Sequence, residues 1–250
     1  MKKKVLLKIF LRSFFIHAAL NFRRMQNLGF AMALIPLIRE WNLARPEAEK
    51  FLTRHLQMFN THPYLSAAII GSVVNMEEAQ DKGSSSSEDT VTIKKILAGP
   101  YAAIGDAFFW SALRPFAAIL SCVLAYLGYV IAPLAFLIIY TPVHIWVRMT
   151  SFFGSYQKGK QGVEFIRSLN LPLIAIRIRW LSLILLIGLT SFLLSSKEYL
   201  QVHILSDIGM KIMAVTVVTV FILLIRKRIS QVYILYGTVI ILFLLSLKEF

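Results

Sequence analysis

The sequence contains a single cysteine and few acidic residues, with 13 Asp and Glu against 27 Lys and Arg among its 250 residues. One cysteine, Cys122, allows neither a disulfide nor a cysteine metal site within the chain. The five histidines lack metal-ligand spacing, and no Gly-Lys-Ser/Thr phosphate loop follows Gly99 or Gly105. The sequence therefore indicates no metal, no cofactor and no catalytic residue of its own.

Charge of either sign is scarce. Charged residues make up 16% of the chain, hydrophobic residues 57%, and the mean hydropathy is +0.68. Soluble domains carry about a quarter charged residues, so lipid must cover part of this apolar surface. The formal net charge of +14 comes from cations beside apolar runs: Lys2–Lys4, Arg148, Arg177, Arg179 and Arg226–Arg228. That placement favours cytoplasmic loops and anionic lipid headgroups over nucleic acid.

The hydropathy pattern predicts an all-α fold. We expect a polytopic integral membrane protein with amphipathic N-terminal helices, short broken or re-entrant helices and a C-terminal transmembrane helix pair. Four regions follow along the chain. They are an amphipathic helical region at 1–58, a membrane core with broken helices and a hairpin at 59–154, a cytoplasmic basic loop at 155–179, and three transmembrane helices at 180–250.

Residues 5–40 mix arginines with apolar residues at helical spacing, such as Leu28, Ala31 and Met32. This pattern predicts helices at the membrane surface or against a partner. Pro36 should kink or end one of them. A polar helix is expected at 45–58, because Pro46 suits its first turn.

The apolar segment 64–76 is too short to span about 30 Å of hydrocarbon, so we expect it to be buried or re-entrant. A flexible loop is predicted at 79–92. The segment 96–110 should be broken at Gly99-Pro100 and Gly105-Asp106. Between Arg114 and Arg148 the chain is uncharged, and a turn near Gly128 would make residues 115–147 a hairpin.

Three apolar runs complete the chain at 180–196, 208–225 and 229–247. The Lys/Arg asymmetry predicts that 155–178 and 226–228 are cytoplasmic and that 197–207 and the C-terminus lie outside.

Asp106 is the most informative charge, because no other acidic residue lies between Asp89 and Glu164. It either lines a polar cavity at membrane depth or caps a helix at the surface. Glu77 remains open as a carboxylate that could accept hydrogen bonds from ligand hydroxyls, whereas Glu78 is interpreted as a solvated segment end. His62 is interpreted as a turn histidine, not a proton relay.

Four ordered blocks resemble subunit IID of the mannose/fructose/sorbose family of sugar phosphotransferase systems. The opening block is Leu11-Arg12-Ser13 with 21–30. The second runs over 54–64, followed by the acidic pair at 77–78; the third is 99–110 with Arg114-Pro115; and the fourth is 156–159. Ordered blocks at family spacing are far more specific than one motif.

The resemblance implies a bacterial inner-membrane, multi-pass subunit that pairs with subunit IIC in a trimeric hetero-assembly to carry a hexose. Soluble IIA and IIB subunits would phosphorylate the sugar, and this chain would carry no phosphoryl group itself. Residues 170–180 and the loop before 208 depart from the family, which leaves a transport-inactive scaffold bound to IIC as the alternative. The candidate substrate-pathway or structural polar residues are Asp106, Glu77, Asn60, Thr61, Gly99, Pro100, Gly105 and Arg114.

Overall fold

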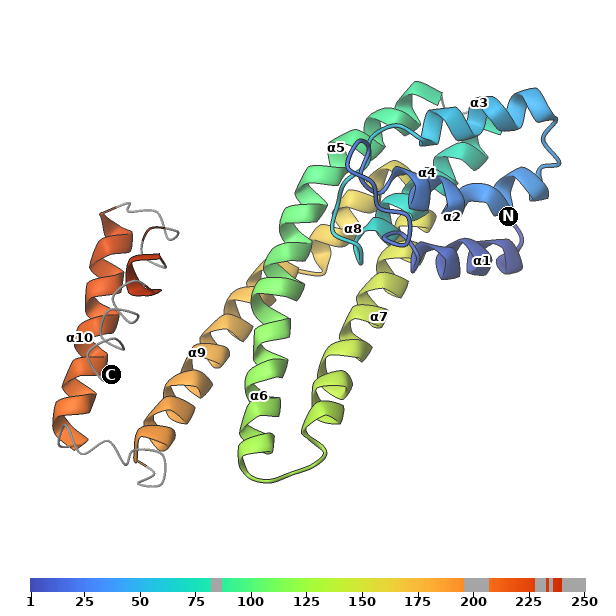
Figure 1. Cartoon of the computed structure of the whole chain (residues 1–250). Helices are drawn as coiled ribbons and strands as arrows, with labels where there is room; N and C mark the ends of the chain where they lie inside the picture. Colours follow the sequence, from blue (N-terminus) through green and yellow to red (C-terminus); the bar gives the residue numbers. More distant parts are fainter. Residues whose placement is uncertain (82–86, 196–206, 228–232, 234–235, 240–250) are drawn as a thin grey trace. The chain divides into compact units, whose positions relative to one another are not determined.

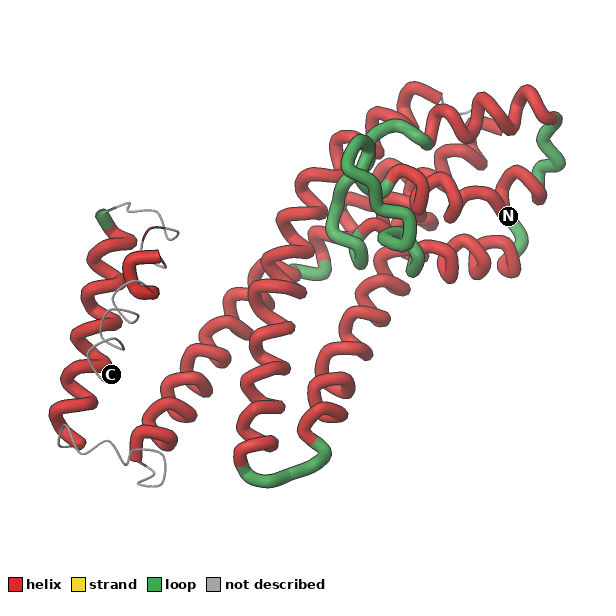
Figure 2. The backbone as a smooth tube through the Cα atoms, in the orientation of Figure 1, coloured by secondary structure: helices red, strands yellow, loops and turns green. Residues whose placement is uncertain are grey.

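The computed structural model describes residues 1–81, 87–195, 207–227, 233 and 236–239. Within them helices are joined by loops and turns, with two isolated bridges and no strand (Figure 2). The chain divides into two compact units, residues 1–186 and 187–250. Helices 88–126, 132–158 and 164–192 are each long and apolar enough to cross a membrane. The predicted all-α membrane fold is therefore confirmed.

The N-terminal helices α1 (Lys3–Ser13) and α2 (Asn27–Glu40) are amphipathic, as expected. In α1 the apolar face of Val5, Leu6, Ile9 and Phe10 is buried. Pro36 does not end α2, which continues for another turn to Glu40. This position is tolerated because the helix is held by packing of its buried face and not by local propensity alone. The polar helix α3 runs over Arg45–His55, with Pro46 in its first turn.

Helix α4 (Ser66–Asp81) is the centre of the core, and its apolar residues from Ala67 to Val74 are fully buried. Small residues let it approach α7 (Ala132–Lys158) closely. A Cβ on Gly71 would lie 2.3 Å from the carbonyl oxygen of Phe152, so only glycine allows this contact. The expectation that 64–76 is buried is confirmed.

Helix α5 (Ser87–Gly105) continues as a π-helix, η1 (Asp106–Leu113), and then as α6 (Arg114–Tyr126). The predicted break at Gly99-Pro100 is therefore wrong, because α5 runs through it. At Gly105-Asp106 the helix does not stop but changes from α-helical to π-helical winding. We call the continuous helix formed by α5, η1 and α6 the rod (Figure 1). The flexible loop predicted at 79–92 is also wrong at both ends, since α4 reaches Asp81 and α5 starts at Ser87; residues 82–86 lie outside the described part.

The hairpin is confirmed. Helices α6 and α7 lie side by side and are joined by residues 127–131, where Gly128 has φ +81° (Figure 1). A positive φ suits glycine because it has no Cβ. Pro133 sits in the first turn of α7, where its missing N–H costs nothing.

The basic segment 155–179 is mostly helical, not a loop. Helix α7 extends to Lys158, a short 3₁₀ turn η2 (Gly159–Gln161) and α8 (Gly162–Ser168) follow, and α9 (Leu171–Ser195) begins nine residues before the predicted 180. In the second unit, α10 (Asp207–Arg226) matches the apolar run predicted at 208–225. Most of the predicted run 229–247 and of the connection 197–207 lies outside the described residues.

Candidate functional site

The connection between α3 and α4, residues 56–65, is fixed by side chains of the N-terminal segment. The amide of Gln26 holds the backbone of Thr61 at two points, with Nε2 donating to its carbonyl at 2.6 Å and Oε1 accepting from its N–H at 3.2 Å. The backbone N–H of Gln26 donates to the carbonyl of Phe59 at 2.8 Å. Thr61 is buried, and its neighbour Asn60 is exposed.

His62 lies at the contact between this connection and the rod. Its ring is 1% exposed and stacks on Phe109 with centroids 5.0 Å apart. The close approach needs Gly105, because a Cβ there would lie 2.2 Å from His62 Cγ. The N–H of Tyr64 donates to Nδ1 at 3.3 Å, so the neutral ring carries its proton on Nε2. Gly105 is therefore a packing residue, and neither it nor Asp106 acts as a helix cap.

Burial, reinforced by the charge of Arg148, lowers the pKa of His62 to about 3. The ring is thus neutral at physiological pH. The interpretation of His62 as a structural histidine agrees with this geometry, although it is far more deeply buried than an ordinary turn residue.

Arg148 was interpreted from the sequence as a charge flanking a membrane span, but it is 2% exposed. Its Nη2 donates to the carbonyl of Pro63 at 2.8 Å, and its guanidinium lies over the rings of Phe14 and Tyr64 at 4.3 and 5.2 Å. These contacts tie α7 to the α3–α4 connection and to the N-terminal segment.

Two further side chains of α7 meet Tyr64. The hydroxyls of Tyr140 and Tyr64 are 3.2 Å apart, and the His144 ring stacks on Tyr64 with centroids 4.5 Å apart. His17 joins this group through Gln26, since the Nε2 atoms of the two side chains are 2.7 Å apart. We call the whole group the polar junction: His17, Gln26, Thr61, His62, Tyr64, Tyr140, His144 and Arg148. Its signal in the sequence was the four-residue spacing of Tyr140, His144 and Arg148, which places them on one face of a helix.

Glu77 belongs to a separate buried group. Its Oε2 accepts from Arg54 Nη2 at 2.5 Å, and its Oε1 lies 3.0 Å from His55 Nε2. Burial lowers the pKa of His55, although Glu77 acts in the opposite direction. Lys94 Nζ donates to the His55 carbonyl at 2.8 Å. We call Arg54, His55, Glu77 and Lys94 the Glu77 clamp.

Both carboxylate oxygens of Glu77 are thus engaged by protein groups, and the side chain is 3% exposed. This arrangement supports a structural role for Glu77 more than a contact with sugar hydroxyls. Glu78 is not a solvated segment end, because Tyr156 donates to its Oε2 at 2.7 Å and it is only 17% exposed.

The structure does not gather the remaining candidates into one site. Asp106 and Arg114 are exposed on the rod, eight residues apart, and Gly99 and Pro100 are exposed on α5. Within the described residues no cluster of His, Cys, Asp and Glu has the geometry of a metal site.

Comparison with known proteins gives a consistent result. The whole chain, residues 1–250, matches the family described as the PTS system mannose/fructose/sorbose family IID component. The mannose-specific EIID component of Escherichia coli K12 is 37% identical over 153 residues, which are 60% of this chain and 54% of that protein. The fructose permease IID component of Bacillus subtilis 168 is 33% identical over 168 residues, 67% of this chain and 60% of that protein. The chain thus aligns with little more than half the length of these relatives.

Two solved structures are similar over nearly the full chain. One is the mannose transporter ManYZ in complex with microcin E492, with a TM-score of 0.62, 26% identity, and coverage of 96% of this chain and 94% of that chain. The other is described as a membrane protein and has a TM-score of 0.76 with 26% identity and the same coverage.

Proposed function

The chain belongs to the mannose/fructose/sorbose-family IID components of the sugar phosphotransferase system, and from this premise we propose that it forms a hexose-translocation complex with a IIC subunit. In this proposal soluble IIA and IIB subunits carry phosphate to the sugar, and this chain orients the pathway without carrying phosphate. The complex is a trimeric hetero-assembly in the bacterial cytoplasmic membrane, which this chain crosses more than once.

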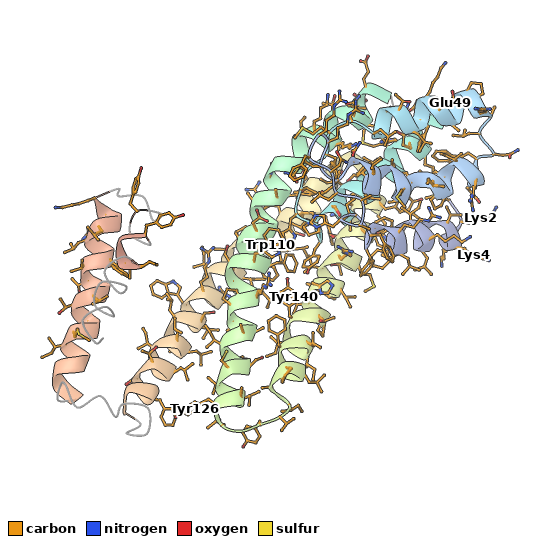
Figure 3. All side chains as sticks on the ribbon, in the orientation of Figure 1. Lys2, Lys4, Glu49, Trp110, Tyr126 and Tyr140 are labelled. Carbon is orange, nitrogen blue, oxygen red and sulfur yellow. The ribbon has the colours of Figure 1, made fainter. Side chains whose placement is uncertain are left out.

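The observation that carries the proposal is the exposure of Arg114, the first residue of α6 in the apolar hairpin. Its depth in the membrane is measured from the connection at the far end of α6. The connection at 127–131 carries Tyr129 and Val130, which are 57% and 96% exposed, and Tyr126 ends α6 beside it (Figure 3). Tyrosines favour the level of the lipid headgroups, so this end of the hairpin fits one membrane interface.

Depth along the rod follows from helix rise. Asp106 is 20 residues from Tyr126, which corresponds to roughly 30 Å, the thickness of the hydrocarbon core. Asp106 then lies at the opposite interface, where an exposed carboxylate is readily solvated. Arg114 is 12 residues from Tyr126, or about 18 Å, and therefore lies well inside the core.

An exposed guanidinium at that depth is costly in lipid, and such residues face a protein partner or an aqueous cavity. Arg114 therefore supports a surface covered by IIC, and it replaces Asp106 as the principal candidate for a functional polar contact. Asn60 and Thr61 differ in their roles in the proposal. The backbone of Thr61 is hydrogen-bonded to Gln26, so Thr61 is structural, whereas the exposed Asn60 can contact the partner subunit or the sugar.

Uptake of labelled hexose tests the function. Cells that lack an endogenous mannose-type system would receive IIC, IIA and IIB with or without this chain, and we expect accumulation of sugar phosphate only with it. Co-purification of the chain with IIC is measured in the same cells. Normal co-purification without any uptake would contradict transport and favour the scaffold alternative.

A further inference from the structure

A groove between α1 and α2 has a composition that no part of the proposed transport function uses. Its volume is about 410 Å³, and its polar wall carries three cations, Lys8, Arg12 and Arg39, with one acid, Glu40. Lys2 already pairs with Glu40, at 3.0 Å between Nζ and Oε1. The groove is therefore strongly positive.

The three cations are not equivalent. Arg12 Nη1 donates to the carbonyl of Met32 at 3.0 Å, which fixes this guanidinium and links α1 to α2. Within the described part of the chain, Lys8 and Arg39 form no ion pair and no side-chain hydrogen bond. Both are exposed. Their N–H groups are thus free to bind an anion from opposite walls of one groove.

The surroundings of the groove are apolar. Leu11 and Ile35 line it together with Val5 and Pro36, and Leu7 and Met32 on the same two helices are each 50% exposed. A small hydrated anion makes no favourable contacts with such apolar walls. A ligand with a negative head and a hydrocarbon tail matches both parts.

The position of the groove along the hairpin also indicates its depth in the membrane. Phe10 of α1 packs on Phe152 and Phe153 of α7, with ring centroids 5.5 and 5.6 Å apart. Phe152 is 20 residues from the start of α7 at Ala132, so it lies roughly 30 Å from the hairpin connection. In Figure 3, Lys2 and Lys4 on α1 lie toward the opposite end of the hairpin from Tyr126. This is the level of the headgroups at the basic face of the protein.

We infer that the groove between α1 and α2 is a binding site for the phosphate of an anionic phospholipid. Arg39 and Lys8 bind the phosphate oxygens through charge-assisted hydrogen bonds, and Arg12 adds its charge from the floor. The acyl chains lie along Leu7, Leu11 and Met32. The amphipathic N-terminal helices thereby bind a specific lipid molecule in addition to resting on the membrane surface.

The test measures lipid binding to single protein molecules. The full-length chain, purified in a neutral detergent, is titrated with phosphatidylglycerol or with phosphatidylcholine of the same acyl chains, and bound lipid is counted by native mass spectrometry. The groove variant is Lys8→Gln/Arg39→Gln, and the matched control is Lys3→Gln/Lys4→Gln, two exposed lysines of α1 that do not line the groove. Unfolding temperature and gel filtration verify that both variants fold.

We expect phosphatidylglycerol to bind roughly thirtyfold more weakly to the groove variant, since each of the two cations contributes roughly fivefold. The control should retain nearly all of its binding. Equal losses in both variants would mean non-specific attraction and overturn the site. Equal binding of phosphatidylcholine would overturn the requirement for negative charge, and displacement of the lipid by excess inorganic phosphate would assign the groove to a free anion.

Discussion

Within residues 1–186, the N-terminal half and the α6–α7 hairpin differ in which side chains they bury and which they expose. In the N-terminal half, Glu77, His55 and Gln26 are almost completely buried, and each has a named partner. In the hairpin, large apolar side chains such as Leu137 and Ile138 are 53% and 60% exposed. The first region is organised like a soluble core, whereas the second needs lipid or another subunit to cover it.

The difference indicates where the fold gets its specificity. Apolar helices in lipid gain little from hydrophobic association with each other, so close packing and hydrogen bonds must select their arrangement. In this chain the polar junction and the Glu77 clamp supply those bonds at one end of the hairpin only. Mutations at that end should therefore reduce stability, and mutations along the exposed hairpin should reduce assembly.

The largest effect is expected for Glu77→Gln. Removing the carboxylate leaves Arg54 and the His55 ring without their anionic acceptor in a buried site, which costs about 3 kcal/mol of unfolding free energy. Thermal unfolding of the detergent-purified chain measures the loss. Glu49→Gln is the control, because the Arg45–Glu49 pair is largely exposed and contributes less than about 1 kcal/mol. Equal shifts in the two variants would show that the clamp is not a stabilising element.

A pair of glycine substitutions sharpens the comparison. Gly105→Ala drives a methyl group into the His62 ring and should lose about 1–3 kcal/mol through overpacking. Gly99→Ala meets nothing within 4 Å and should gain up to about 1 kcal/mol from helix propensity. The same thermal unfolding assay reports both. A loss at position 99 or a gain at position 105 would refute the packing described for the rod.

The pH dependence of stability tests His62. Its folded pKa of about 3 lies below the ordinary value of 6.5, so between these values the unfolded state binds a proton that the folded state excludes. Unfolding free energy therefore falls with decreasing pH, by about 2 kcal/mol between pH 6.5 and pH 5. His62→Asn keeps an acceptor for the Tyr64 N–H but does not titrate. The drop in unfolding temperature from pH 7 to pH 5 should be smaller in this variant, and an unchanged drop would place the titration elsewhere.

The smallest effect on stability is expected for Arg114→Gln, within about 0.5 kcal/mol, because the side chain is exposed and, among the described residues, forms no ion pair or hydrogen bond. Its effect on function should be much larger, with reduced co-purification with IIC and reduced hexose uptake. Asp106→Asn is the matched control on the same rod, placed at the membrane surface. If Asp106→Asn impaired assembly and Arg114→Gln did not, the depth assignment along the rod would be wrong.

Much of the fold could be predicted from periodicity and charge. The hairpin followed from an uncharged stretch too long for one span, and α10 followed from its apolar run. The boundaries of α5 and α9 could not be predicted this way. Gly99-Pro100 looks like a helix break in sequence, yet tertiary packing overrides a local penalty of a few kcal/mol. The basic residues 155–179 suggest a loop, but helix termini also carry cations favourably.

The candidate site was predictable in part. Thr61, Gly105 and Glu77 are indeed at buried contacts, but nothing local to the sequence shows that Gly105 meets His62 or that Glu77 meets Arg54. Arg148 was missed because a cation next to an apolar run usually marks a membrane boundary. The lone signal for its burial was the spacing that it shares with Tyr140 and His144. Depth, burial and partners depend on tertiary structure, which no single sequence pattern encodes.

The π-helix at Asp106–Leu113 sets the rotational orientation of α6, the helix that continues directly from it. An α-helix turns about 100° per residue, so each residue taken up by a wider turn moves the faces of α6 around its axis by that amount. Deleting one residue from η1 would restore ordinary winding while turning Arg114 by roughly a quarter of a circle. The π-helix thus determines which face of α6 carries Arg114, while Gly105 and Phe109 hold the start of the π-helix against the His62 ring.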